Sequence, residues 1–134
     1  MTQTETNRRT VPGAELFFGE SVAQYLADLS DDVFSEEGYA EGLLLGRRYR
    51  DDLGEYVIVS GVTQDLSRTK DAVGWFKSSE SCDIGQADIA RMVALFGYVR
   101  TCAIAVDYAQ GSMAMYIVEN GVARRAPSAM VENL

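Results

Sequence analysis

The chain has 134 residues, of which 47% are apolar and 24% charged, as expected for one globular domain. Its formal net charge of −8 argues against nucleic acid or an anionic membrane as a partner. Histidine is absent, so the commonest zinc ligand and the usual general base near neutral pH are both missing. With two cysteines, no apolar run long enough for a bilayer and no signal segment, we expect a cytoplasmic protein.

The first half of the chain predicts one helix among strands. Residues 1–13 are polar and lack periodicity, so we expect a flexible tail. A helix over residues 21–34 is predicted because apolar residues recur at helical spacing, namely at Val22, Tyr25, Leu26 and Leu29. Apolar or β-branched runs predict strands at 14–18, 39–46 and 55–62, the last two joined in a hairpin by a turn at 51–54.

The second half is organised around residues 72–92. A buried strand at Val73–Phe76 opens into a polar loop and then a helix, for which Asp83 is the expected N-cap, with Gln86 in the capping-box position. Apolar residues at helical spacing carry this helix to Phe96, and Gly97 ends it. Further strands are predicted at 101–106, 113–118 and 122–125, followed by a loose tail over 127–134.

This order predicts an α+β fold over residues 14–126, with a mixed sheet or half-open barrel flanked by helices. Four segments then carry a family resemblance: Gly42-Leu-Leu-Leu-Gly46, Val73-Gly-Trp-Phe76, Asp88, and Ala103-Ile-Ala-Val-Asp107. Together they resemble the JAMM/MPN domain, the cytidine-deaminase-like fold of zinc isopeptidases and their inactive partners. In that family the Gly-Trp strand is followed by His-x-His and then by Ser-x-x-Asp on the next helix.

The resemblance implies a degenerate site. The family's general-base glutamate falls at Tyr39, and the nearby Glu41 is expected to lie out of register and to point to the other face of its strand. The two zinc histidines fall at Lys77 and Ser79, and the motif serine falls at Gly85. Asp88 alone matches a zinc ligand, so neither catalysis nor a metal or other cofactor is expected.

Asp88 has two interpretations. The Lys77 ammonium is predicted to take the place of the metal and to pair with Asp88, which would make the pair a structural replacement for the zinc. Alternatively, Asp88 is an acidic residue in the first turn of a helix, where the helix dipole favours it.

The function that this resemblance implies is that of an inactive MPN-like pseudoenzyme that works by protein–protein interaction. Inactive members act as scaffolds, so we expect a homodimer, or a heterodimer with another MPN-like protein. The two predicted helices are the expected contact surfaces, through Val22, Tyr25, Leu26, Leu29, Met92, Leu95 and Phe96.

Two other function classes stay open. A hydrolase with a rebuilt site would use Lys77 with the neighbouring serines, or a metal bound through Glu80, Cys82, Asp83 and Asp88. A ligand sensor would instead use the vacated cleft beside Trp75 and Tyr39.

Overall fold

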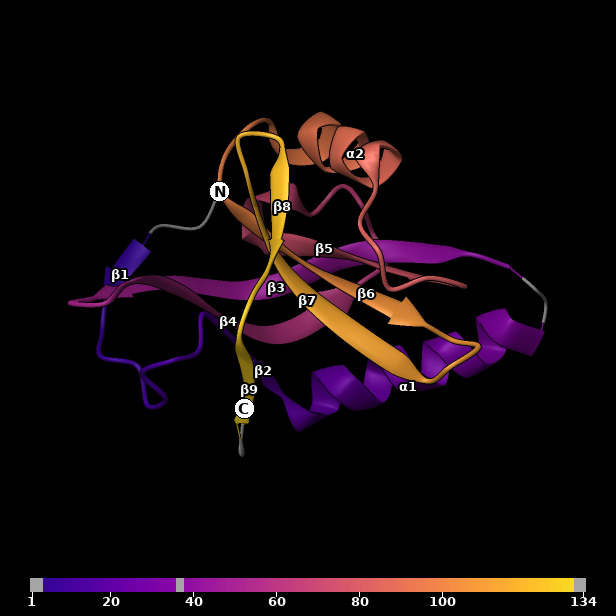
Figure 1. Ribbon diagram of the computed structural model, residues 1–134, viewed down its shortest axis with the longest axis horizontal. Coiled ribbons are helices and arrows are strands. Elements are labelled where there is room, and N and C mark those ends of the chain that lie inside the picture. The colour runs from indigo at the N-terminus through magenta and orange to yellow at the C-terminus, as the bar shows by residue number, and fades with distance from the viewer. Residues whose placement is uncertain (1–3, 36–37, 132–134) are drawn as a thin grey trace.

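The computed structural model describes residues 4–35 and 38–131, which form two α-helices and one mixed sheet (Figure 1). The helices are α1 (Glu20–Ser35) and α2 (Gln86–Phe96), and a 3-10 turn spans Thr69–Asp71. The strands are β1 (Thr4–Thr6), β2 (Leu16–Gly19), β3 (Ala40–Asp51), β4 (Gly54–Thr63), β5 (Ala72–Ser79), β6 (Thr101–Asp107), β7 (Ser112–Glu119), β8 (Val122–Arg125) and β9 (Ser128–Val131).

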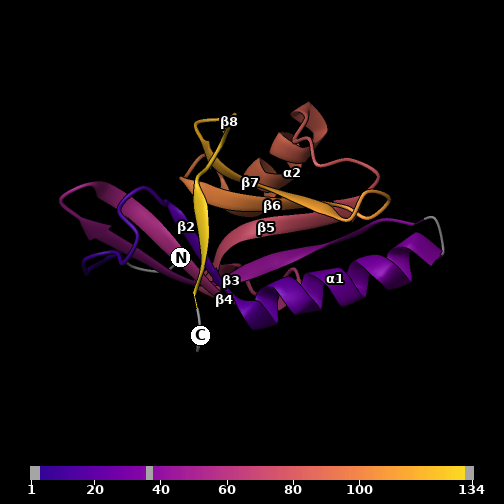
Figure 2. The ribbon, with the colours of Figure 1, turned by 60° about the horizontal axis from the view of Figure 1, so that its bottom comes forward.

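The sheet curls into a half-open barrel. Its strands follow the order β8-β7-β6-β5-β3-β4-β2-β9, with β1 paired to β3. Although β8 and β9 stand at opposite ends of this order, they belong to one extended segment of chain, which Figure 2 shows in yellow. Within that segment, Ala126 N donates to Met115 O on β7, and Pro127 O accepts from Glu15 N just before β2. One segment therefore bridges both ends of the sheet, and the predicted α+β half-barrel is confirmed.

The two helices cover opposite faces of the sheet (Figure 1). Helix α1 packs Val22 and Leu26 against a core that includes Phe76. On the opposite face of the sheet, helix α2 packs Met92 against Trp75. Because side chains alternate along a strand, β5 supplies Phe76 to one layer and Trp75 to the other. This two-sided burial explains why the Val73–Phe76 stretch is apolar throughout.

Both segments that were expected to be tails contribute strands. Strand β1 pairs in parallel with residues 48–50 of β3, and β9 pairs in parallel with β2. The Arg9 side chain is buried and binds Asp51 at 2.7 Å, which ties the N-terminal segment to the end of β3. The expectation of a loose segment without regular structure was wrong for residues 4–6 and 128–131. Partners distant in sequence form these strands, and local periodicity carries no sign of such pairing.

Three of the predicted strands continue beyond their expected ends. Strand β3 extends to Asp51, β4 begins at Gly54, and β5 extends past Phe76 to Ser79. The longer β5 holds Lys77 within the sheet, where its position is fixed by backbone pairing on both sides. Within the described residues, neither helix is long and apolar enough to cross a membrane.

Candidate functional site

The end of β5 and the first turn of α2 bring one cation and one carboxylate together. Lys77 lies on the face of β5 that α2 covers, and its Nζ donates to Oδ2 of Asp88 at 2.9 Å. The two side chains are only 8% and 17% exposed. The predicted Lys77–Asp88 pair is therefore confirmed, in a largely desolvated setting where charges interact more strongly than in water.

Asp88 also caps the helix. Its Oδ2 accepts the backbone N–H of Gly85 at 2.9 Å, and Gly85 is the N-cap of α2. The prediction that Asp83 is the N-cap was wrong, because the helix begins at Gln86 and the N–H of Asp83 is bound by Ser81 Oγ. Both interpretations of Asp88 therefore hold: it is the partner of Lys77 and a favourable acidic residue in the first turn.

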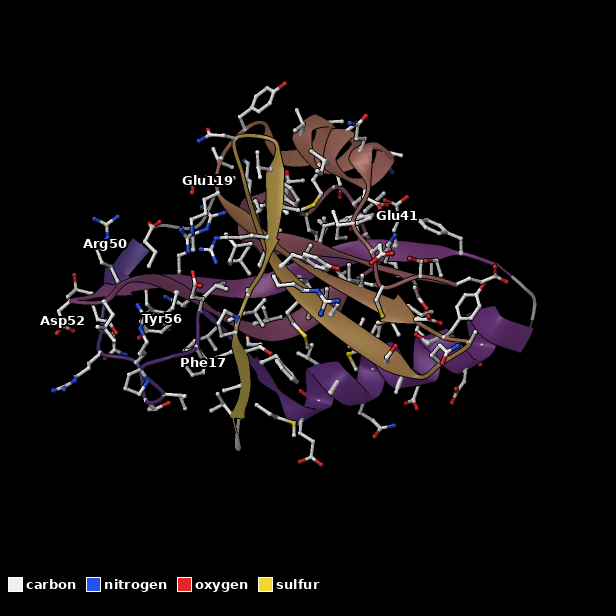
Figure 3. The ribbon with its side chains drawn as sticks, in the orientation of Figure 1. Phe17, Glu41, Arg50, Asp52, Tyr56 and Glu119 are labelled. Atoms are coloured by element: carbon white, nitrogen blue, oxygen red, sulfur yellow. The ribbon has the colours of Figure 1, made fainter. Side chains whose placement is uncertain are left out.

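A second ion pair lies beside the first and has the opposite polarity. Glu41 on β3 is the register partner of Lys77 on β5, and its carboxylate accepts two bonds from Arg91 of α2, at 2.8 and 3.2 Å. The indole N–H of Trp75 donates to the same carboxylate at 3.0 Å. Figure 3 shows Glu41 beneath α2. The sheet thus presents one cation, Lys77, and one anion, Glu41, to α2, and each binds a residue of opposite charge on that helix.

These contacts set the protonation of the cluster. Burial would raise the pKa of Glu41, but the hydrogen bonds from Arg91 and Trp75 outweigh it, so the pKa lies below its ordinary value. Partial burial, followed by the negative charges of Glu41 and Asp88, raises the pKa of Tyr39 to about 12. Near neutral pH, Glu41 is therefore ionised and Tyr39 is a neutral phenol, which is unsuited to act as a general base.

Comparison with known proteins supports the fold. No family sequence profile matches the chain, and no curated protein gives a significant sequence match. A solution structure of protein DSY2949 from Desulfitobacterium hafniense is similar, with a TM-score of 0.65, 14% identity, and coverage of 89% of this chain and 94% of that one. The structure described as "JAMM: A Metalloprotease-like Zinc Site in the Proteasome and Signalosome" has a TM-score of 0.55 and 14% identity, and the match covers 85% of this chain and 97% of that one.

This chain has an MPN-like fold. A JAB1/MPN domain protein from Archaeoglobus fulgidus, AF2198, was also found, with a TM-score of 0.46, 15% identity, and coverage of 87% of this chain and 96% of that one. The match to the JAMM structure, with its TM-score of 0.55, confirms the sequence resemblance at the level of the fold.

The structure places the family's site positions in different surroundings. Tyr39 precedes β3 and is 54% exposed. Ser79 ends β5 and is part of a local turn, with its Oγ bonded to the backbone of Ser81. Gly85 is the N-cap of α2. Asp88 joins two of the other positions directly, since its Oδ2 accepts from Lys77 Nζ and from the backbone N–H of Gly85, each at 2.9 Å.

The donor set does not fit a catalytic zinc ion. Such a site takes about three nitrogen, sulfur or oxygen ligands and leaves one position open. Here the residues that the resemblance assigns to the ligand positions are Lys77, Ser79 and Asp88, and the Asp88 Oδ2 is already shared by Lys77 and Gly85. Across the described residues, no three of Cys, Asp or Glu gather in a way that would hold a metal. The alternative ligand set of Glu80, Cys82, Asp83 and Asp88 is therefore not assembled.

The other two alternative sites are not assembled either. Lys77 binds Asp88, and the neighbouring Ser78 hydroxyl points to the opposite layer, where it bonds Ser30 of α1 at 2.7 Å. Ser79 shares the face of Lys77, but its hydroxyl is bonded to the backbone of Ser81. Trp75 is fully buried and bonded to Glu41, so its indole lies in a packed layer and not in an open cleft.

Several residues expected at an interface belong to the core. Val22, Leu26 and Met92 are each about 1% exposed, because they hold the helices to the sheet. Leu29 is partly buried and packs against the core cluster that contains Val22 and Leu26. Leu95 and Phe96 are partly buried and pack against the cluster that contains Met92. Tyr25 is the member of this set that is exposed. The apolar helix faces are therefore explained by packing within the domain.

Sequence reasoning missed Glu41 and Arg91. The prediction that Glu41 points to the other face of its strand was wrong: it faces α2 as the strand partner of Lys77 and binds Arg91. Residues two apart in a strand share a face, so the strand predicted over 39–46 already places Glu41 on the same side as Tyr39. Arg91 had a usable signal as well, since it follows Asp88 by three residues on one side of a helix.

Proposed function

We propose that this MPN-like domain is a pseudoenzyme that binds proteins, and that it forms a homodimer. The loss of catalysis is supported by one observation above all, the Lys77 Nζ held 2.9 Å from the Asp88 carboxylate. An ammonium group is not a metal ligand, and its positive charge repels a cation from the aspartate that matches the family's ligand. Zinc binding at this position would therefore require the displacement of Lys77 and the loss of a largely buried ion pair.

The contact surface that the geometry supports best is the outer edge of β9. This strand ends the sheet and is paired to β2 on one side. An edge strand presents unpaired N–H and C=O groups to which another strand can bind. Its sequence, Ser-Ala-Met-Val, carries no charge, and Met130 is 58% exposed.

The other end of the sheet is protected. Strand β8 carries Arg124 and Arg125, and exposed charges on an edge strand disfavour pairing with another chain. The contrast between the two edges favours an antiparallel β9–β9 contact around a two-fold axis, since identical patches meet in such a dimer.

The metal half of the proposal is tested by elemental analysis. Untagged protein would be purified from zinc- and manganese-supplemented medium without chelator. We expect less than about 0.1 equivalent of any transition metal, because the required ligand set is incomplete. A near-stoichiometric metal that is lost in Asp88→Asn would contradict the proposal and make the domain a metalloprotein.

The dimer is tested by light scattering coupled to size-exclusion chromatography over about 1 to 100 µM protein, a range that detects weak association. We expect a dimer that Met130→Lys converts to a monomer. Leu53→Lys is the matched control, because Leu53 is 59% exposed and lies in the turn between β3 and β4, outside β9. A monomer at every concentration, or equal effects of the two variants, would contradict the β9 homodimer.

A further inference from the structure

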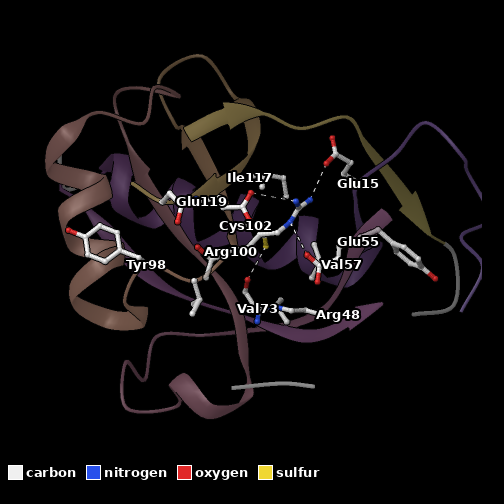
Figure 4. Close-up of a pocket in the computed structure, with 14 residues that line it drawn as sticks. Glu15, Arg48, Glu55, Val57, Val73, Tyr98, Arg100, Cys102, Ile117 and Glu119 are labelled. Carbon is white, nitrogen blue, oxygen red and sulfur yellow. Dashed lines mark hydrogen bonds and ion pairs between the residues drawn. The ribbon is translucent and has the colours of Figure 1, made fainter. Parts of the chain in front are cut away.

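A pocket of about 320 Å³ lies away from the Lys77–Asp88 pair. It is lined by residues of β3 and β4, the start of β5 and β6, the end of β7, and the segments before β2 and β6 (Figure 4). Val73 contributes from the start of β5, whereas Lys77 stands near the end of the same strand. Figure 3 likewise shows Glu119, which lines the pocket, well separated from Glu41. The volume lies at the lower end of the range typical of small-molecule sites, about 300–1,000 Å³.

The carboxylates in this pocket already have cationic partners. Arg100 lies 3.2 Å from Glu15, 3.7 Å from Glu55 and 3.9 Å from Glu119, as the dashed lines in Figure 4 show. Glu15 is bound further by Arg124, at 2.6 and 2.8 Å. The hydrogen bond from Arg124 is the main reason that the pKa of Glu15 lies below its ordinary value. Each of the three carboxylates therefore already has a cationic partner within the protein.

Arg48 lacks the ion pairs that Arg100 makes among the described residues. It lines the pocket and is half-buried, yet within the described residues its guanidinium makes neither a hydrogen bond nor an ion pair. Burial lowers the pKa of Arg48, which is the mark of a cation that has lost water without gaining an adequate partner. Its five donors and planar shape suit a carboxylate, which it can bind through two parallel hydrogen bonds.

The rest of the pocket is apolar. Val57, Val73 and Ile117 belong to the buried core and form part of the wall. Cys102 also lines the pocket, and burial raises its pKa to about 12, so the thiol is neutral and behaves as an apolar group. Tyr98 lies at the exposed side. A ligand that fills this space must combine one anionic group with an apolar body.

We propose that this pocket binds a small amphiphilic carboxylate. The carboxylate is bound by Arg48, and the hydrocarbon part packs against Val57, Val73 and Ile117. The site is separate from the Lys77–Asp88 cluster and from the β9 edge, so it does not depend on the proposed dimer. It gives the domain a ligand-sensing capacity at a place other than the one expected from sequence.

Octanoate is the probe, with acetate as the head-group control and octanol as the uncharged control. Binding is followed by amide chemical shifts of the full chain, which locate the ligand as well as measure affinity. We expect octanoate to shift Val57, Val73, Cys102 and Ile117, and to bind at least about tenfold more tightly than acetate or octanol. Shifts confined to other parts of the chain, or equal binding of octanoate and octanol, would overturn the proposal.

Arg48→Gln tests the charge. It should weaken octanoate binding about tenfold or more, whereas Arg47→Gln, which removes the same charge from the opposite face of β3, should leave affinity within about twofold. In the absence of ligand, Arg48→Gln should unfold at the same temperature as the wild type or a higher one, because it removes a poorly compensated buried charge. Equal affinities for the two variants would overturn the proposal, and the unfolding temperature shows that a loss of binding is not a loss of the fold.

Discussion

Glu41 and Lys77 lie opposite each other on β3 and β5, and each binds a residue of opposite charge on α2. Two ion pairs of opposite polarity thus attach the helix to the sheet, Lys77 with Asp88 and Glu41 with Arg91. Exchanging the order of charges on the helix would place like charges together. The two ion pairs therefore determine where α2 lies over the sheet, and they also help to hold the helix there.

The Lys77–Asp88 pair should show measurable coupling. Lys77→Met leaves a largely buried carboxylate without its cation, so we expect a loss of about 1–3 kcal/mol in the free energy of unfolding. Asp88→Asn keeps an oxygen for the Gly85 N–H but leaves Lys77 unpaired. The double variant Lys77→Met/Asp88→Asn leaves neither charge unpaired. Its loss in the free energy of unfolding should therefore be smaller than the sum of the losses of the two single variants. Urea unfolding measures all four proteins, and strictly additive losses would contradict the coupling.

Histidines introduced at the two positions that the resemblance assigns to them should create a metal site. Lys77 and Ser79 lie two apart on β5 and so share a face with each other, toward α2. We expect Lys77→His/Ser79→His to bind close to one zinc ion per chain, using Asp88 as the third ligand and water as the fourth. Calorimetric titration measures the binding, and adding Asp88→Asn should abolish it. Failure of the double variant to bind zinc would show that the structural correspondence with the family's site is incorrect.

The sequence was informative where a pattern is local. Helical spacing found α1 and α2, because each buries one face through residues three or four apart, such as Val22 and Leu26. The Lys77–Asp88 pair was predicted from the family resemblance, which assigns Lys77 at a strand end and Asp88 at a helix start to positions of one motif. The boundary at Gly85 was missed because the capping group is supplied by Asp88, three residues later, and not by a side chain at the N-cap.

What the sequence did not reveal depends on register and on distant pairing. Glu41 meets Lys77 because β3 and β5 pair at these two residues, which no local pattern specifies. Strand β9 exists because residues 128–131 reach β2 at the other end of the chain. The pocket likewise joins Arg48 to Arg100 from separate elements, with no motif to connect them.

Gly74 should be intolerant of any side chain. A Cβ at this position would overlap the backbone oxygen and the Sγ of Cys102 on β6, so β5 and β6 could not keep their present pairing. We expect Gly74→Ala to lower the free energy of unfolding by about 1–3 kcal/mol or more. Gly61→Ala is the matched control in β4, where the nearest atom to a new Cβ is 3.8 Å away. Urea unfolding that gave equal losses for the two variants would contradict the close approach of β5 to β6.

Acid should weaken the attachment of the N-terminal segment. Arg9 donates to both oxygens of Asp51 at 2.7 Å, and these side-chain hydrogen bonds hold the pKa of Asp51 well below its usual range. Because the folded pKa is lowered, the stabilisation is fully present above the unfolded value near 3.8 and is lost as the pH falls toward the folded value. The melting temperature should therefore fall steeply from about pH 5 to pH 2.

Asp51→Asn should lower the melting temperature at pH 7, because it leaves the buried Arg9 guanidinium without its carboxylate. It should also flatten the decline below pH 5, since the group that takes up the proton has been removed. Asp52→Asn is the matched control: the same substitution at the adjacent exposed position should leave the melting profile close to that of the wild type. If both variants retained the full acid dependence, the Arg9–Asp51 pair would not be its source, and the other carboxylates with a lowered pKa, Glu15, Glu41 and Asp65, would be the next to replace.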